Sequence, residues 1–142
     1  MAHSFDLQVL TPEYEFYNGK TVSVTVKSID GFLTVWANHV AMACVLDVGQ
    51  LTIRTEDETL IAFHSKGFMQ VIDNTVTILS QACEWPENID EIRAESARQR
   101  AAERLASEGF ETASGNKAAL SRARARLDII RQAREKKKND KK

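Results

Sequence analysis

The sequence predicts an α+β protein, with an N-terminal antiparallel β-sandwich followed by a C-terminal two-helix hairpin. Up to about residue 80, apolar and polar residues alternate in short runs, which is the period of half-buried strands. Turn dipeptides such as Asp30-Gly31 and Asp73-Asn74 separate these runs. After Trp85-Pro86 the chain becomes rich in alanine, arginine, glutamate and glutamine, which favour helices. We therefore expect a β-sandwich domain over residues 1–86 and a helical hairpin with a basic tail over residues 87–142.

The strands are expected in a regular series. Alternating Phe5, Leu7 and Val9 predict the first strand, and Asn18-Gly19 predicts a tight hairpin turn because both residues tolerate positive φ. Later strands are expected near residues 22–26, 50–54, 59–64, 68–72 and 75–79. Many short antiparallel strands at this spacing are typical of a sandwich or a flattened barrel.

The helical part begins with a capping signal. Asn88 is expected to cap the first helix, with Glu91 three residues later as in a capping box, and the helix should run through Glu108. Gly109 is expected to end it, residues 112–116 to form a polar turn, and a second helix to run from Lys117 to Glu135 before a fraying lysine-rich tail. The expected apolar stripes are Ile89, Ile92, Ala94, Ala97, Ala101 and Leu105 on the first helix and Leu120, Ala123, Leu127 and Ile130 on the second.

These stripes are thin. Alanine buries little area, so at ~25 cal/mol per Å² a mostly alanine seam contributes only a few kcal/mol. The hairpin is therefore expected to dock conditionally and to open at small cost.

Charge is distributed unevenly along the chain. Residues 1–86 carry four basic and ten acidic side chains, whereas residues from 117 onward carry eleven basic and three acidic ones. Such a division indicates two modules with different electrostatic partners.

No pattern predicts catalysis or a metal site. Cys44 and Cys83 lie among apolar neighbours without metal or redox spacing, and His3, His39 and His64 lack metal-ligand spacing and an accompanying nucleophile. Gly19-Lys20-Thr21 lacks the earlier glycine and the following helix that a phosphate-binding loop requires. We expect a non-catalytic protein that needs no cofactor, has no targeting signal and does not insert into the membrane.

An ordered set of segments resembles one family along nearly the whole chain. The set consists of the opening run 5–13, Phe16-Tyr17-Asn18-Gly19, Asp30-Gly31 followed by Asn38-His39, residues 49–53, Lys66-Gly67-Phe68, and Ile89-Asp90-Glu91-Ile92-Arg93-Ala94. In this order they resemble the ε subunits of bacterial F-type ATP synthases.

The resemblance implies a rotor subunit on the cytoplasmic side of the bacterial membrane. It implies the γ subunit, the c-ring and the catalytic α and β subunits as partners, with Asp30, Gly31, Phe32 and His39 meeting the c-ring. It also implies that the C-terminal helices can extend toward the catalytic head and restrain ATP hydrolysis. The basic second helix suits an acidic surface there, with an attraction that salt should weaken.

In some members of that family, the pattern kept here as Ile89, Asp90, Arg93 and Ala94 marks a regulatory ATP site. Arg93 and Arg100 share one helix face, and Arg122 and Arg126 share a face of the second helix. If the helices pair antiparallel, these rows can converge on a polyphosphate, with Glu84 and Asp90 orienting ribose or base groups. The alternative is a solvated arginine face with local pairs, namely Arg104–Glu108, Arg124–Asp128 and Arg131–Glu135.

Two other functions remain open at this point. The basic second helix, with Lys136-Lys137-Lys138 and Lys141-Lys142, can bind nucleic acid in a salt-dependent way. The β-sandwich argues against this, because it is acidic and lacks an aromatic stacking platform. A free-standing nucleotide sensor without a motor is the third alternative, and γ with the c-ring, nucleic acid or nothing would co-purify with the chain in the three cases.

Overall fold

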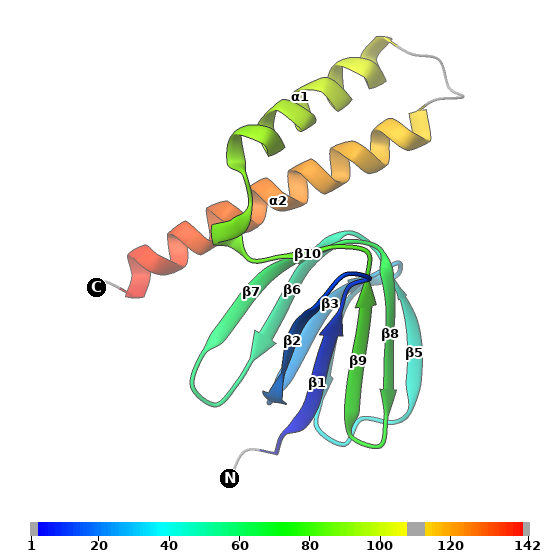
Figure 1. The fold of residues 1–142 in the computed structure, drawn as a ribbon, viewed down its shortest axis with the longest axis vertical. Coiled ribbons are helices and arrows are strands. Elements are labelled where there is room, and N and C mark those ends of the chain that lie inside the picture. Colours follow the sequence, from blue (N-terminus) through cyan, green and yellow to red (C-terminus); the bar gives the residue numbers. More distant parts are fainter. Residues whose placement is uncertain (1–2, 108–112, 141–142) are drawn as a thin grey trace. The chain divides into compact units, whose positions relative to one another are not determined.

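The computed structural model describes residues 3–107 and 113–140 of the chain. It divides into two compact units, Met1–Glu84 and Trp85–Lys142. The first unit consists of strands and the second of helices (Figure 1), so the α+β class expected from the sequence is confirmed.

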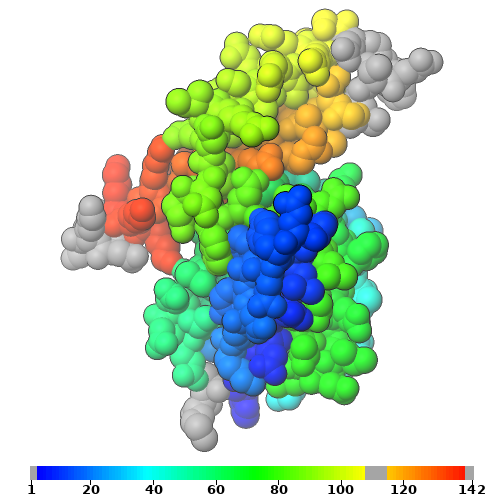
Figure 2. Space-filling view, in the orientation of Figure 1, coloured from blue at the N-terminus to red at the C-terminus, as the bar shows by residue number. Residues whose placement is uncertain are grey.

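The first unit is built from ten short strands. Their bounds are β1 Phe5–Leu10, β2 Glu15–Thr21, β3 Ser23–Ser28, β4 Gly31–Trp36, β5 Met42–Leu46, β6 Gly49–Arg54, β7 Thr59–His64, β8 Gly67–Ile72, β9 Thr75–Ser80 and β10 Cys83–Glu84. The strands are hydrogen-bonded in the order β10-β7-β6-β3-β5-β8-β9-β1-β2, and β4 pairs with β3. The pairs are antiparallel except that β1 runs parallel to β9, a detail that the sequence pattern did not reveal. In the space-filling view the blue side chains of β1 and β2 lie beside the green ones of β9 (Figure 2).

The core of this unit follows the predicted alternation. Phe5, Leu7 and Val9 of β1 are buried, while Asp6 between them is exposed. The same inward positions on other strands supply the largest buried side chains, which include Leu46, Leu51, Ile53, Phe63, Met69 and Ile78. Period-two side-chain alternation thus places one face of each strand in a shared apolar interior.

The prediction of a hairpin turn at Asn18-Gly19 is wrong. Both residues lie inside β2, where Gly19 pairs with Leu7 of β1. The chain instead turns at residues 11–14, where the Thr11 N–H donates to the Tyr14 carbonyl at 2.9 Å. A turn dipeptide is only permissive for positive φ, and here the long β1–β2 register keeps the backbone extended.

Two other predicted turns are confirmed. Gly31 has a φ of 123° at the β3–β4 turn, and Asp73 and Asn74 have φ of 49° and 57° between β8 and β9. Positive φ is the conformation for which Gly, Asp and Asn are suited, so turn chemistry and structure agree at these sites.

The second unit contains a short 3-10 turn, η1 Pro86–Asn88, and two helices, α1 Glu91–Ser107 and α2 Ala113–Asp140. Asn88 does not cap α1, because it belongs to η1. Asp90 is the cap, since its Oδ1 accepts the Arg93 N–H at 3.0 Å and its carbonyl accepts the Ala94 N–H at 2.9 Å.

The second helix is longer than predicted at both ends. Of the turn expected at residues 112–116, the described residues 113–116 already belong to the helix, which continues past Glu135 to Asp140. Lysine is a good helix former, so the basic tail extends the helix rather than ending it. Gly109, the predicted terminator, lies outside the described residues.

The seam between α1 and α2 is narrow. Its buried residues are Ala94, Ala101, Ala123 and Ile130, with Ile89 just before α1. The prediction that Ile92 belongs to this stripe is wrong, since its side chain is 81% exposed. Ile92 lies two residues from Ala94, about 200° around the helix, and therefore on the opposite face. Ile129, which the stripe did not include, is buried.

Candidate functional site

The β3–β4 turn presents one of the two groups of candidate residues. The Ser28 hydroxyl donates to the Gly31 carbonyl at 2.7 Å and accepts the Asp30 N–H at 3.2 Å, which fixes the turn. Phe32 follows with its ring 67% exposed and the Lys27 ammonium 4.8 Å from the ring centroid. A fixed turn carrying an acidic, a small and an aromatic residue is suited to contacting another protein surface.

His39 does not join this group. It follows β4, whereas the turn with Asp30 precedes β4, so the two lie at opposite ends of a six-residue strand. A strand of that length spans about 17–20 Å. The His39 ring is half-buried and its Nδ1 donates to the Val40 carbonyl at 2.8 Å. In the same loop, the Asn38 N–H donates to the Asn74 side chain at 2.7 Å.

A buried histidine for which the sequence predicted no functional role lies near the β3–β4 turn. His64 ends β7 with no exposed surface. Its Nε2 accepts the Lys27 N–H at 3.1 Å, and its Nδ1 donates to the Ser65 carbonyl at 3.1 Å. Burial lowers the pKa of His64, an effect only partly opposed by the Ser65 carbonyl and by the charge of Asp47. Its position at a strand end before Ser65-Lys66-Gly67 was the available signal.

The candidate nucleotide-binding residues divide between the two units. Glu84 is half-buried in β10 of the first unit, while Asp90, Arg93, Arg100, Arg122 and Arg126 belong to the second. Asp90 uses a carboxylate oxygen as the cap of α1, and Arg93 and Arg100 are exposed on that helix. Arg122 and Arg126 are half-buried on α2.

The helices of the hairpin run antiparallel (Figure 1), and an ion pair fixes their register. Glu91, at the start of α1, accepts two hydrogen bonds from the Arg134 guanidinium, one of them at 3.1 Å. Counting from this pair, Arg100 lies level with residue 125 and thus beside Arg126, with Arg122 one turn further along α2. Along the helix axis, Arg93 lies about 9 Å from Arg126, toward the end of the hairpin where α1 begins.

The arginines also share one side of the hairpin. Arg93 and Arg100 each precede a buried alanine by one residue, and Arg122 likewise precedes Ala123. In an antiparallel pair, residues that precede the seam by one position lie on the same side. Arg93, Arg100 and Arg122 therefore lie on one side of the hairpin, and Arg126 follows Arg122 by one turn of α2. Guanidinium groups in such a row can engage polyphosphate oxygens.

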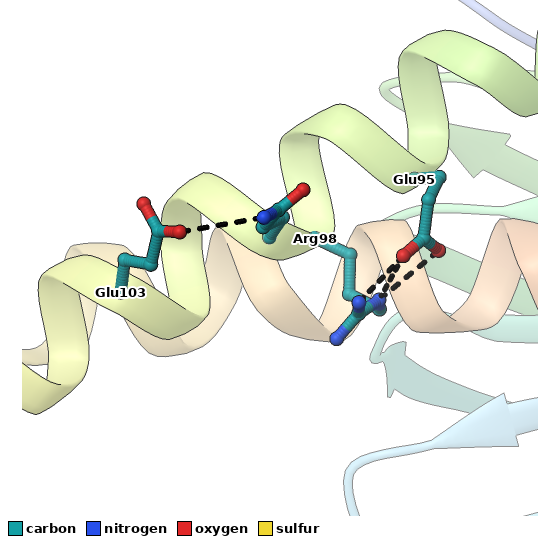
Figure 3. A network of polar contacts seen from close by, with 4 residues as sticks. Glu95, Arg98 and Glu103 are labelled. Atoms are coloured by element: carbon teal, nitrogen blue, oxygen red, sulfur yellow. Dashed lines mark hydrogen bonds and ion pairs between the residues drawn. The ribbon is translucent and has the colours of Figure 1, made fainter.

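Other charged residues of the helices pair locally. Glu95 accepts hydrogen bonds from Arg98, the shortest at 2.5 Å, and the neighbouring Gln99 donates to Glu103 at 3.4 Å (Figure 3). Arg131 pairs with Asp128 at 3.1 Å. The local pairs named from the sequence were instead Arg124 with Asp128 and Arg131 with Glu135. The i,i+3 spacing brings Asp128 and Arg131 to the same face.

Within residues 3–107 and 113–140, no cluster of three metal-ligating side chains is present. In the same part of the chain, neither helix combines the length and the apolar character needed to cross a bilayer.

An acidic unit of ten strands followed by a hairpin of two long helices defines a class of two-module proteins. Residues 4–86 match the family model for the β-sandwich domain of the ATP synthase delta/epsilon chain, and residues 87–131 match that for its long α-helix domain. The chain belongs to the ATP synthase delta/epsilon chain family.

Individual relatives agree with this family. The chain is 35% identical over 132 residues to the ATP synthase epsilon chain of Clostridium kluyveri, covering 92% of this chain and all of the relative. It is 37% identical over 132 residues to that of Ruminiclostridium cellulolyticum, covering 92% of this chain and 98% of the relative. This chain is therefore a component of ATP synthase.

Solved structures share the fold. A chain of the Euglena gracilis mitochondrial ATP synthase, in a structure of OSCP, F1 and the c-ring, superposes with a TM-score of 0.78 at 20% identity, covering 92% of this chain and 81% of that one. A chain from the central stalk and c-ring of Tetrahymena thermophila mitochondrial ATP synthase gives a TM-score of 0.58 at 22% identity, with 90% and 94% covered.

Proposed function

We propose that this chain is the ε-type rotor subunit that links the γ subunit to the c-ring and restrains ATP hydrolysis through its helical hairpin. The observation that carries the proposal is the contrast between the two units. A densely cored β domain presents a fixed turn, whereas the described part of the hairpin buries three alanines and three isoleucines, and its second helix is basic. The first is suited to permanent attachment and the second to a change of conformation.

The turn at Asp30, Gly31 and Phe32 is the proposed contact with the c-ring. The Ser28 hydroxyl donates to the Gly31 carbonyl and accepts the Asp30 N–H, and these two bonds hold the turn in one shape, so little conformational entropy is lost on binding. His39, at the opposite end of β4, serves a different contact or a structural role. On this proposal the subunit is peripheral on the cytoplasmic side of the bacterial membrane.

The basic end of α2 is the proposed contact with the catalytic α and β subunits. Lys137 and Lys138 are exposed in the last turns of α2 and lie beyond the level of Glu91, where α1 begins. A cationic helix end attracts an acidic surface, and salt weakens the attraction.

The decisive experiment adds the chain back to the host's catalytic head after this subunit has been removed. The full chain is expected to bind and to inhibit ATP hydrolysis, whereas residues 1–86 are expected to bind without inhibiting. Equal inhibition by both forms would refute regulation by the hairpin. Failure of both forms to bind would refute the rotor assignment.

ATP is the proposed regulatory ligand of the hairpin, held by Arg93, Arg100, Arg122 and Arg126. Calorimetry should detect saturable ATP binding to the full chain that is lost in the double variant Arg100→Ala, Arg126→Ala. The matched control is Arg131→Ala, whose guanidinium already pairs with Asp128, and it should bind ATP like the unchanged chain. Identical binding curves for the double variant and the control would refute the proposed nucleotide site.

A further inference from the structure

On the edge of β3 that faces away from β4, the ladder is interrupted around Lys27 and an imidazole takes the place of a strand. β3 pairs with β6 at Ser23, Val24 and Thr25, and with β5 at Ser28. Between these two pairings the Lys27 N–H donates to His64 Nε2 at 3.1 Å, and the Lys27 carbonyl accepts the Asp47 N–H at 3.0 Å. His64 therefore replaces a strand partner at the point where β3 passes from one neighbour to the next.

Close packing keeps the ring in that position. His64 is fully buried and is the register partner of Gly49 on β6 and of Cys83 on β10. A Cβ added at Gly49 would come within 2.4 Å of the Lys27 Cβ, so β3 approaches β6 here as closely as glycine allows. No room is left for the ring to turn to another acceptor without moving a strand.

The two ring bonds define the protonation state. Because a carbonyl only accepts, Nδ1 must carry the proton, and because the Lys27 N–H only donates, Nε2 must be bare. The neutral Nδ1–H tautomer satisfies both bonds. If Nε2 were also protonated, its N–H would point at the Lys27 N–H, two donors would face each other, and the Lys27 N–H would lose its acceptor.

We propose that His64 is an acid-releasable latch, a positioning residue whose neutral ring holds the C-terminal end of β3 and thereby the turn that carries Asp30, Gly31 and Phe32. The turn follows one residue after Lys27. The same segment is also held by the Asp47 N–H, which donates to the Lys27 carbonyl at 3.0 Å, by the Ile29 N–H, which donates to the Val45 carbonyl at 3.1 Å, and by the pairing of β3 with β4. Loss of the Lys27 N–H bond therefore weakens the attachment of this segment on the edge of β3 that faces away from β4.

Charged and titratable groups around the ring come from each neighbouring element. They are Lys27 of β3, Asp47 before β6, Cys83 and Glu84 of β10, and Lys66 after β7. Of these, Asp47 favours the charged ring, while burial opposes it more strongly and lowers the pKa of His64. The folded state thus binds fewer protons than the unfolded chain below about pH 6.5, so stability falls as the pH falls through that value.

The test is a pH titration of the intact chain by NMR between pH 8 and pH 5. His64 should remain the neutral Nδ1–H tautomer below pH 6.5. Amide exchange at Lys27 and Ile29, corrected for intrinsic rates, should show an opening constant that rises by up to about tenfold per pH unit below 6.5. A His64 ring that titrates near 6.5 while these amides stay protected would overturn the latch.

A matched pair of variants assigns the effect to this ring. His64→Gln keeps an acceptor and a donor but cannot titrate, so it should lose the pH dependence of exchange between pH 7 and 5. His39→Gln, in the loop after β4, should retain it. Equal pH dependence in both variants would refute the proposal, and if His64→Gln does not fold, the ring titration of the unchanged chain decides alone.

A consequence for the motor rests on the proposed function. Binding of the chain to its assembly through the turn should weaken between pH 7 and 5.5 for the unchanged chain and less so for His64→Gln. If the isolated chain behaves as a latch but binding shows no such difference, the c-ring role of the turn fails while the latch stands. If the isolated chain shows no latch, the inference itself fails whatever the assembly does.

Discussion

The two units of the molecule are built from different kinds of interior. The β domain buries large side chains such as Phe5, Leu7, Leu51, Phe63 and Met69, each with at most 1% of its surface exposed. Among the described residues of the hairpin, the buried side chains are those of three alanines, Ala94, Ala101 and Ala123, and of three isoleucines, Ile89, Ile129 and Ile130. Because apolar stabilisation scales with buried area, the two units should differ in how readily each opens.

On the proposed function, this difference separates attachment from regulation within one chain. A domain that must transmit rotation benefits from a large, interlocked core, whereas an element that changes conformation must have little to lose on opening. The charges follow the same division, with the acidic excess in residues 1–86 and the basic excess in α2. Four experiments test this comparison, from the largest expected effect to the smallest.

Replacing one leucine by alanine in each unit should lower the opening free energy of that unit by very different amounts. Leu7→Ala removes a fully buried side chain, so the opening free energy of β-domain amides should fall by about 2–5 kcal/mol. Leu105→Ala on α1 removes a half-buried one and should lower the opening free energy of hairpin amides by about 1 kcal/mol. Hydrogen exchange resolved by residue measures both in the intact chain. Equal losses would contradict the comparison.

Enlarging the seam should open the hairpin without touching the β domain. Ala101→Leu adds volume where the helices meet and should cost the hairpin about 1–3 kcal/mol. Ala106→Leu, on an exposed position of the same helix, is the control and should change it by less than about 0.5 kcal/mol. Helix content by circular dichroism and exchange in α1 report the result. Loss of protection in β1 or β9 would show that the units do not open separately.

The cap of α1 can be located by a pair of alanine substitutions. Asp90→Ala removes the acceptor of the Arg93 N–H and should destabilise the start of α1 by about 1 kcal/mol. Asn88→Ala, in the preceding 3-10 turn, should have almost no effect on α1. Exchange at Arg93 and Ala94 distinguishes them, and a larger effect at Asn88 would restore the capping box expected from the sequence.

The rates at which the two cysteine thiols are alkylated report the opening of the β domain without any substitution in the chain. Burial raises the pKa of Cys83 to about 11, and its side chain is almost fully buried, whereas Cys44 is half-buried. At pH 8 iodoacetamide should modify Cys44 first. Modification of Cys83 should become up to about tenfold faster per pH unit, since only the thiolate reacts.

The probe also checks the independence of the units. Cys83 lies in β10, so its labelling rate should be the same in Ala101→Leu as in the unchanged chain. Faster labelling of Cys83 in that variant would mean that opening the hairpin also loosens the end of the β domain.

Local chemistry predicted much of this fold because most elements are decided locally. Alternation predicted β1, and positive-φ residues marked the turns at Gly31 and Asp73-Asn74. The local pattern predicted wrongly at Asn18-Gly19, where pairing with β1 keeps extended a dipeptide that often forms a turn. It also failed at Asn88, because Pro86 starts a separate turn and moves the cap to Asp90.

The sites depended more on tertiary structure. Helix periodicity alone placed Arg93 with Arg100 and Arg122 with Arg126, but the level at which the two rows meet follows from the Glu91–Arg134 pair. Periodicity could not separate His39 from the turn at Asp30, since that requires knowing that β4 runs between them.

By itself, the sequence determined the α+β class, the change of character near residue 86, the family resemblance and the thin, basic hairpin. These follow from composition, period and motif, which act over a few residues. The parallel pairing of β1 with β9 and the burial of His64 against Lys27 were decided by the tertiary structure. Each of these joins segments through backbone register and close packing, and a partner distant in sequence leaves no local pattern at either residue.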